Sequence, residues 1–233
     1  GKSQEKVKDE KQKLLEQYMA KEVEVTGTNF SLGFFDKDFN PVGIVSIAKT
    51  DEPCLPNTYM IKYVAVDDSL QGKGFGSYLY DIAAVSAQEI GGDDAGITSD
   101  RKDSTTTDAG GIWKRISKKY KVKETKQGNK KFDYGGKTTP DDPDDDCRAP
   151  EDGNPATDYS WLIPNSLFVR ALSIQNAQYD LFRKNEKNAP DDIDNRLVDW
   201  FQSVYSKGAE KGIVENKLIN KLIRKTKPDK NGD

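Results

Sequence analysis

The sequence contains no histidine among its 233 residues and only two cysteines, Cys54 and Cys147. The lack of histidine excludes histidine-based catalytic triads, histidine metal sites and acid–base catalysis by an imidazole. Two cysteines cannot form a disulfide framework, which favours a reducing origin inside a cell, with one bridge between them as the open alternative. No apolar run is long enough to cross a membrane, and the first residues do not resemble a signal peptide. We therefore predict a cytoplasmic location, no membrane contact and no metal site.

Apolar residues are also scarce, at 34% of the sequence against 32% charged residues. This balance predicts that parts of the chain are exposed tails or linkers. The net charge of −3 hides two blocks of opposite sign, since residues 114–131 carry nine basic residues and one acid, whereas residues 141–152 carry seven acids and one arginine. The basic block, with Tyr120 and Phe132 interleaved, is compatible with binding nucleic-acid phosphates. We favour a solvated surface, or a counter-surface for the acidic block, which lacks the ligand spacing of a calcium loop.

Hydrophobic periodicity predicts a chain of mixed helices and strands. Residues 3–21 have one apolar stripe at helical spacing, which predicts an amphipathic helix. Alternating residues at 30–35 and 42–48 predict a hairpin, and the nearly apolar run at 59–66 predicts a strand buried on both faces. The other predicted elements are a helix at 79–90, a short strand at 95–99, a helix at 108–119, a second hairpin at 120–125 and 131–134, and helices at 161–179, 193–205 and 215–225.

A glycine-rich loop follows the strand predicted at 59–66 and opens into a helical pattern. Glycines on alternate positions allow positive φ angles and bring N–H groups close to an anion, and the following helix adds the positive end of its dipole. The loop is therefore predicted to hold a phosphate. It is not a Walker A loop, because Gly74 stands where that motif needs Ser or Thr, and it fits a dinucleotide fingerprint poorly, because the sixth position is Ser77. Its sequence is Gln71-Gly72-Lys73-Gly74-Phe75-Gly76.

The spacing Gln71-x-x-Gly74-x-Gly76, between an apolar strand that ends at Val66 and a helix, resembles the acyl-CoA-binding motif of the GNAT superfamily of N-acetyltransferases. The order of the predicted elements over residues 29–135 resembles the core of the same family. The resemblance implies an α+β fold with a mixed, mostly antiparallel central sheet flanked by helices. It also implies that loop amides hold the pyrophosphate of coenzyme A and that amides at the strand end line the pantetheine and the thioester. The predicted cofactor-binding residues are Val64, Ala65, Val66, Gln71, Gly72, Lys73, Gly74, Phe75 and Gly76.

The activity that the resemblance implies is transfer of an acetyl group from acetyl-CoA to an amine that the sequence does not identify. In that family a tyrosine on the helix after the short strand commonly reprotonates the departing thiolate. Aligning the family signature on Ala109 places Thr106 and Trp113 where the family has Asn and Tyr, and an indole cannot act as an acid near neutral pH. Tyr120, two helical turns beyond Trp113, is the predicted substitute, with packing as the alternative interpretation. Four aspartates near strand ends are candidate bases, although each also fits a turn or a cap: Asp67, Asp68, Asp100 and Asp103.

The sequence divides into four predicted parts. An N-terminal helix and lead-in at 1–28 precede a GNAT-like core at 29–135, an acidic Pro- and Asp-rich linker at 136–157 and a C-terminal helical appendage at 158–233. Only one helix precedes the first hairpin, whereas the family usually has a strand and a helix pair there. Either residues 23–25 serve as a short first strand or that part was removed. The appendage is predicted to select a protein partner or the substrate.

A second hypothesis starts from the step Ser99-Asp100-Arg101, followed by a Ser/Thr-rich turn and Ala-x-x-x-Trp. This stretch is similar to GNAT-like proteins of bacteriophages. The chain also begins with Gly1 instead of Met, which fits removal of an N-terminal segment by a protease. The alternative is therefore a virion-associated structural or delivered protein that keeps the GNAT fold with weak or no catalysis. Such a protein would reside in the phage particle and bind other virion proteins through its C-terminal helices.

Overall fold

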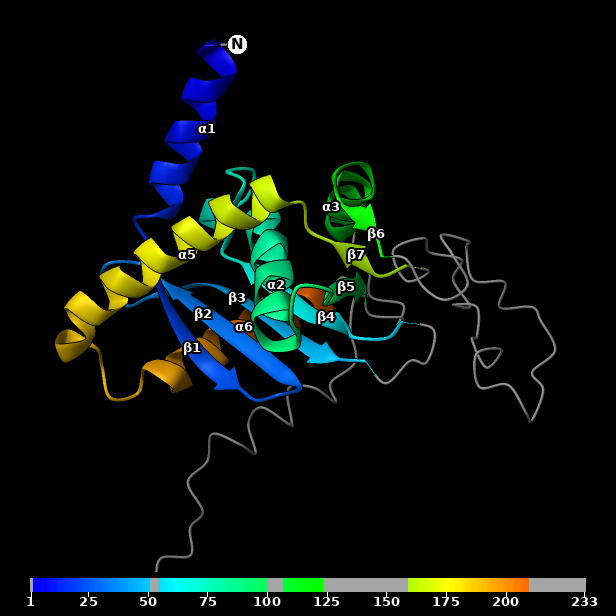
Figure 1. The fold of residues 1–233 in the computed structure, drawn as a ribbon. Coiled ribbons are helices and arrows are strands. Elements are labelled where there is room, and N and C mark those ends of the chain that lie inside the picture. The colour runs from blue at the N-terminus through cyan, green and yellow to red at the C-terminus, as the bar shows by residue number, and fades with distance from the viewer. Residues whose placement is uncertain (1, 51–54, 100–106, 124–158, 210–233) are drawn as a thin grey trace, which may run out of the picture.

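The computed structural model describes residues 2–50, 55–99, 107–123 and 159–209, and Figure 1 shows its ribbon. These residues form a seven-stranded sheet in the order β1-β2-β3-β4-β5-β7-β6. Neighbouring strands are antiparallel except β4 and β5, which run parallel. The mixed sheet with its flanking helices confirms the predicted fold class. The strands are β1 (Met19–Val25), β2 (Asn29–Phe35), β3 (Pro41–Lys49), β4 (Thr58–Val66), β5 (Gly96–Ser99), β6 (Lys121–Val122) and β7 (Trp161–Leu162).

Helices cover both faces of the sheet. One face carries α2, α3 and α5, and α6 crosses the opposite face (Figure 1). The helix α1 precedes β1 and projects from the body of the fold (Figure 1), and Leu15 at its C-terminal end packs in the main core. In the part of the chain that the structure describes, no helix is long and apolar enough to cross a membrane. The helical elements are α1 (Lys2–Leu15), η1 (Asp68–Leu70), α2 (Phe75–Gly91), α3 (Thr107–Lys119), α5 (Asn165–Asn185), η3 (Glu186–Asn188) and α6 (Ile193–Ala209).

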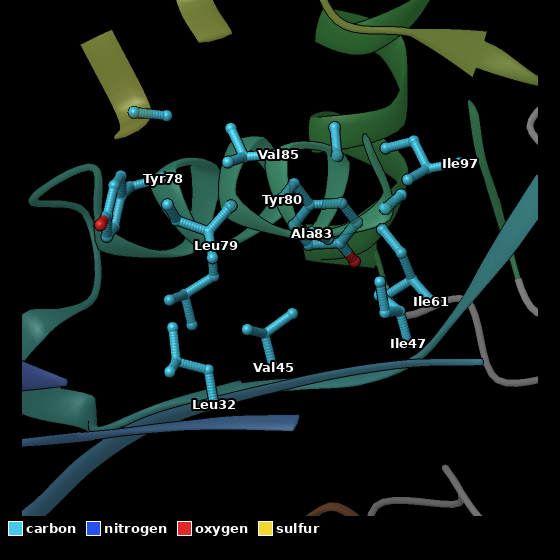
Figure 2. Close-up of a cluster of buried hydrophobic side chains, with 14 of the residues drawn as sticks. Leu32, Val45, Ile47, Ile61, Tyr78, Leu79, Tyr80, Ala83, Val85 and Ile97 are labelled. Atoms are coloured by element: carbon cyan, nitrogen blue, oxygen red, sulfur yellow. The ribbon is translucent and has the colours of Figure 1, made fainter. Parts of the chain in front are cut away.

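The main core lies between the sheet and α2. Figure 2 shows strand side chains such as Leu32 and Val45 pointing toward Leu79 and Ala83 of the helix. The helix is buried on nearly every side, because α5 and α3 cover the surfaces that the sheet leaves free. Full burial of one Leu or Ile side chain contributes roughly 1.5–3 kcal/mol, so this helix is the central stabilising element. It also starts directly after the glycine-rich loop, which ties the loop to the core.

A second, smaller core lies under α6. Ile193, Leu197 and Phe201 recur every four residues on one face of that helix, and all three are buried against the sheet. The sheet contributes Phe35 and Ile44 to the same cluster. The helix therefore covers the face opposite α2, as its apolar stripe requires.

This arrangement corrects the predicted division at residue 158. The strand β7 lies inside the sheet between β5 and β6, and α5 packs against both β1 and α2. Residues 159–209 are thus part of the same fold instead of an appendage, because their apolar faces complete its two hydrophobic cores. The predicted linker at 136–157 and the predicted helix at 215–225 lie outside the described residues.

The last strands pair in a way that the sequence did not predict. Lys121 and Val122, at the start of the hairpin expected from 120–125 and 131–134, pair with Leu162 and Trp161 of β7. A buried hydrogen bond from Thr58 Oγ1 to Ser160 Oγ, 2.7 Å long, attaches the start of β7 to β4. The expected strand at 131–134 lies outside the described residues.

The N-terminal lead-in contains a complete edge strand. The expected short strand at 23–25 is the end of β1, which pairs with β2 from Met19 to Val25. It follows α1 instead of preceding a helix pair, so the helical layer on the α2 face comes from α5, far along the chain. The expected first strand therefore exists, in a different order from the family's usual one.

Candidate functional site

The described pairing between β4 and β5 covers the first half of β4. This parallel pairing runs from Thr58 with Gly96 to Ile61 with Ser99, the last described residue of its segment. On its other side β4 continues to pair with β3 as far as Val66. Within the described residues no strand pairs with the β5-side edge of residues 62–66, so that edge offers backbone N–H and C=O groups to a ligand.

A bulge in β4 follows the last of these pairs. The register with β3 shifts between Ser46 and Ile47, which leaves Lys62 as an extra residue in β4. A bulge bends its strand and increases the local twist, so β4 changes direction just beyond Ile61. The bulge therefore lies at the start of residues 62–66, whose β5-side edge has no partner strand among the described residues.

The side chains of residues 63–66 are fixed on both faces. Val64 and Val66 pack against the main core under α2, whereas Tyr63 and Ala65 pack against the core under α6. The Tyr63 ring lies 4.7 Å from the Phe201 ring, centroid to centroid. This packing holds the strand in place and leaves its backbone edge for binding. The predicted residues Val64, Ala65 and Val66 thus lie on the stretch of β4 whose β5-side edge has no partner strand among the described residues.

The glycine-rich loop leads from the end of this strand into α2. Gly72 and Gly74 have φ angles of 73° and 87°, a region that favours glycine, and Gly74 is the N-cap of α2. Leu70 and Phe75 are buried and hold the loop from below, with the Phe75 ring 5.4 Å from that of Tyr18. The glycines and Lys73 are therefore presented on top of a fixed base, as the phosphate prediction requires.

The first turn of α2 completes a site for an anion. The N–H groups of its first residues have no acceptor within the helix, and the helix dipole adds a partial positive charge at the same end. The side chain of Gln71 donates to Asp68 Oδ1 at 2.8 Å, which braces the loop instead of facing an anion. Backbone amides near Gly72, Gly74 and Gly76 remain the groups best suited to bind a phosphate.

The candidate bases at the end of β4 have local roles. Asp67 caps η1 by accepting from the N–H and the hydroxyl of Ser69, at 3.0 and 2.6 Å. Asp68 accepts from Gln71 as described. Both contacts agree with the interpretation of these residues as turn or cap residues. Asp100 and Asp103 lie outside the described residues, as does Thr106.

Tyr120 lies in a buried polar cluster between α2 and α3. Its hydroxyl donates to Asp81 Oδ1 at 2.7 Å, and Arg115 donates to the same oxygen and to the Ser77 carbonyl, both at 3.0 Å. Burial, followed by the Asp81 charge, raises the pKa of the Tyr120 hydroxyl well above its ordinary value. A hydroxyl so placed is a poor proton donor, and the geometry favours a structural role. The catalytic role of Tyr120 stays a prediction.

The sequence did not predict the roles of Asp81 and Arg115, because neither residue belongs to a motif. The only signal was their opposite charges, each on a helix. Arg115 ties α3 to the first turn of α2 and so helps to fix the loop. Trp113, at the family's tyrosine position, is 7% exposed and packs edge-to-face on Tyr80 with ring centroids 5.6 Å apart.

The basic block is described only as far as residue 123. Lys123 is 9% exposed, and it donates to the Pro56 carbonyl at 2.9 Å and to Asp94 at 3.3 Å. Burial opposes the shift, but the bond to Lys123 and its charge hold the pKa of Asp94 below its ordinary value. This lysine is therefore structural. The other lysines of the described part, at 114, 118, 119 and 121, are exposed, and nucleic-acid binding by them stays untested.

Residues 4–101, which include β4 and the loop, match the family model of the Acetyltransferase (GNAT) family. This segment, which is less than half of the chain, is thus similar in sequence to GNAT acetyltransferases. The match supports the predictions of an acetyltransferase and of acetyl-CoA, the co-substrate of that family. No curated protein matches the chain.

Two solved structures are similar to the chain at low identity. One is a Bacillus subtilis acetyltransferase in complex with CoA, at 19% identity and a TM-score of 0.34, covering 45% of this chain and 77% of that one. The other is the IAA acetyltransferase of Bacillus cereus, at 18% identity and a TM-score of 0.30, covering 41% of this chain and 57% of that one.

Proposed function

We propose that this protein binds acetyl-CoA along the β5-side edge of β4 and transfers the acetyl group to an amine. The observation that carries the proposal is the direct continuation of residues 62–66, whose β5-side edge has no partner strand among the described residues, into a glycine loop at a helix N-terminus. An elongated ligand with a phosphate at one end and an amide-rich arm fits both parts at once. The family match over residues 4–101 supports the same ligand.

The glycine loop and the end of β4 would bind different parts of acetyl-CoA. The loop amides at Gly72 to Gly76 would hold the phosphates, and the N–H groups of Val64 and Val66, on the edge away from β3, would donate to the carbonyl groups of the bound arm. When bound, acetyl-CoA supplies a thioester; the amine nitrogen bonds to its carbonyl carbon while the C–S bond breaks. The amine loses a proton, and the sulfur takes one up. The proposal names the acceptor only as an amine, since neither the fold nor the family match identifies its chemical class.

Titration calorimetry with acetyl-CoA tests the binding step. We expect saturable heat with one site per chain, because the loop and the strand edge form a single continuous surface. Release of free thiol with a panel of small and peptidyl amines then tests turnover. No heat at about a hundredfold excess of acetyl-CoA over protein would remove the proposal altogether.

One observation favours a second function, a protein that keeps the GNAT fold without turnover. Trp113 stands where the family places its tyrosine acid, and it is buried against Tyr80. Binding of acetyl-CoA with no thiol release across the amine panel would support this second function. A role in a bacteriophage particle would be a more specific version of this second function, and none of the similar proteins supports a phage origin.

Replacing Tyr120 by phenylalanine separates packing from catalysis. We expect a loss of about 1–2 kcal/mol in the free energy of unfolding at neutral pH, because the bond to Asp81 is removed. The folded-state pKa lies above the unfolded value, so the stabilisation is complete below that value, near pH 10, and falls as pH rises past it. The stability gap between the two proteins should therefore narrow above about pH 10.

The kinetics of the Tyr120→Phe variant test the alternative, that Tyr120 is the catalytic acid. If Tyr120 is the acid, its loss lowers the rate of thiol release by roughly a hundredfold or more at unchanged KM. A purely structural residue changes the rate only in proportion to the folded fraction. We expect the second result, measured well below the melting temperature of the variant.

A further inference from the structure

The last turn of α1 is fixed against the first turn of α2. The Gln178 side chain donates through Nε2 to the Leu15 carbonyl at 2.9 Å and accepts through Oε1 from the Tyr78 hydroxyl at 2.7 Å. Gln178 is 0% exposed, so both bonds are shielded from water. Tyr18, just beyond the helix, packs edge-to-face on Phe75 of the loop. The end of α1 is thus held beside the glycine loop.

Lys11 is carried to the loop by this contact. It lies four residues before Leu15, so the two side chains share a face of α1, and Leu15 is buried in the main core. The Cδ atom of Lys11 lies 3.8 Å from the point that a Cβ on Gly74 would occupy. The ammonium group is only two bonds farther along an exposed side chain. It can therefore reach an anion bound at Gly74.

No acidic residue lies three or four positions from Lys11 in α1. These positions hold Val7, Lys8, Leu14 and Leu15. Lys13 provides a contrast two residues on, because its ammonium forms an ion pair with Asp9 at 2.9 Å. That hydrogen bond and the Asp9 charge raise the pKa of Lys13. Of these two lysines, the structure places Lys11 at the loop.

We propose that Lys11 is a phosphate-binding residue of the acetyl-CoA site, and that α1 supplies a cationic arm to a cradle otherwise made of backbone amides. The inference rests on the function proposed above and adds to it a residue outside the loop. An ammonium group and amide N–H groups bind phosphate oxygens in complementary ways, the first through charge and the second through direction. The phosphate concerned is either the pyrophosphate or the 3′-phosphate of coenzyme A.

Calorimetry with three variants tests the inference. We expect Lys11→Ala to weaken acetyl-CoA binding about threefold to tenfold at low ionic strength, with a smaller effect at high salt. Lys13→Ala removes the same charge from the same helix and should leave the dissociation constant unchanged. Lys11→Arg should keep most of the affinity, because it keeps the charge. Circular dichroism of each variant checks that α1 stays folded.

The choice of probe distinguishes the two phosphates and the two proposals. Equal loss with acetyl-CoA and with 3′-dephospho-CoA assigns Lys11 to the pyrophosphate, and loss with acetyl-CoA alone assigns it to the 3′-phosphate. Binding by the wild-type protein with no difference between Lys11→Ala and Lys13→Ala overturns the Lys11 inference alone. No binding by the wild-type protein overturns both this inference and the proposed function.

Discussion

Replacing Gly74 by alanine is expected to weaken acetyl-CoA binding by about tenfold or more. Gly74 has a φ of 87° at the N-cap of α2, a conformation that costs an L-residue roughly 1–2 kcal/mol. Relaxing that strain rotates the peptides on either side, and with them the amides aimed at the phosphate. The added methyl group would also lie against the Lys11 stem, at 3.8 Å. Calorimetry with acetyl-CoA measures the loss directly.

Gly92 provides the matched control at the other end of the same helix. Its φ of 88° and ψ of 174° lie in a region that is nearly exclusive to glycine, and within 4 Å a Cβ there would meet nothing. Gly92→Ala should therefore lower the free energy of unfolding by about 1–3 kcal/mol, at least as much as Gly74→Ala. Its dissociation constant for acetyl-CoA should stay unchanged. Equal losses of affinity in the two variants would show that general destabilisation, not the loop, controls binding.

The part of the fold that could be predicted from the sequence is the part with local patterns. Alternating apolar residues gave the hairpin of β2 and β3, and the glycine loop marked the junction of β4 and α2. The strands β6 and β7 have two residues each and carry no pattern of their own. Their pairing depends on contacts between residues far apart in the chain, which periodicity does not report.

The candidate site divides in the same way. Gly72 and Gly74 were predicted because only glycine suits their backbone angles, and the structure gives both a positive φ. Lys11 was not predicted, because a lysine on an amphipathic helix normally belongs to its solvated face. The signal available in the sequence was its position four residues before Leu15 on the apolar stripe, combined with the lack of a nearby acid. What α1 packs against could come only from the fold.

Replacing Gln178 by methionine is the second change with a large expected effect. Methionine has a similar volume but no amide, so the Tyr78 hydroxyl would lose its buried partner, and the Leu15 carbonyl would keep only the bond from the Tyr18 N–H, at 3.2 Å. A buried polar group without a partner costs about 1–3 kcal/mol, and a lost hydrogen bond about 0.5–1.5 kcal/mol. We expect a loss of roughly 2–4 kcal/mol in the free energy of unfolding, measured by urea denaturation.

Gln175 is the matched control, one turn earlier on α5 and also 0% exposed. Its Oε1 has no hydrogen-bond partner among the described residues, and its Nε2 makes one long bond, 3.3 Å, to the Tyr179 hydroxyl. Tyr179 keeps its bond to Glu22 without it. Gln175→Met removes an unsatisfied buried carbonyl and should therefore change stability by less than about 1 kcal/mol, or raise it. Equal losses in the two variants would mean that replacing any buried glutamine by methionine on this helix destabilises the fold, and that the hydrogen bonds of Gln178 have no special role.

The Gln178 variant also tests whether α5 controls the cofactor site through α1. The Gln178 amide bonds both to the end of α1 and to α2. Lys11 lies near Gly74 only while the end of α1 stays in place. In the Gln178→Met background, Lys11→Ala should therefore lower the affinity for acetyl-CoA much less than in the wild-type protein. The difference between the two losses is the coupling energy of a double-mutant cycle. Additive losses would show that α1 stays at the loop without Gln178, and that Tyr18 and Phe75 hold it there.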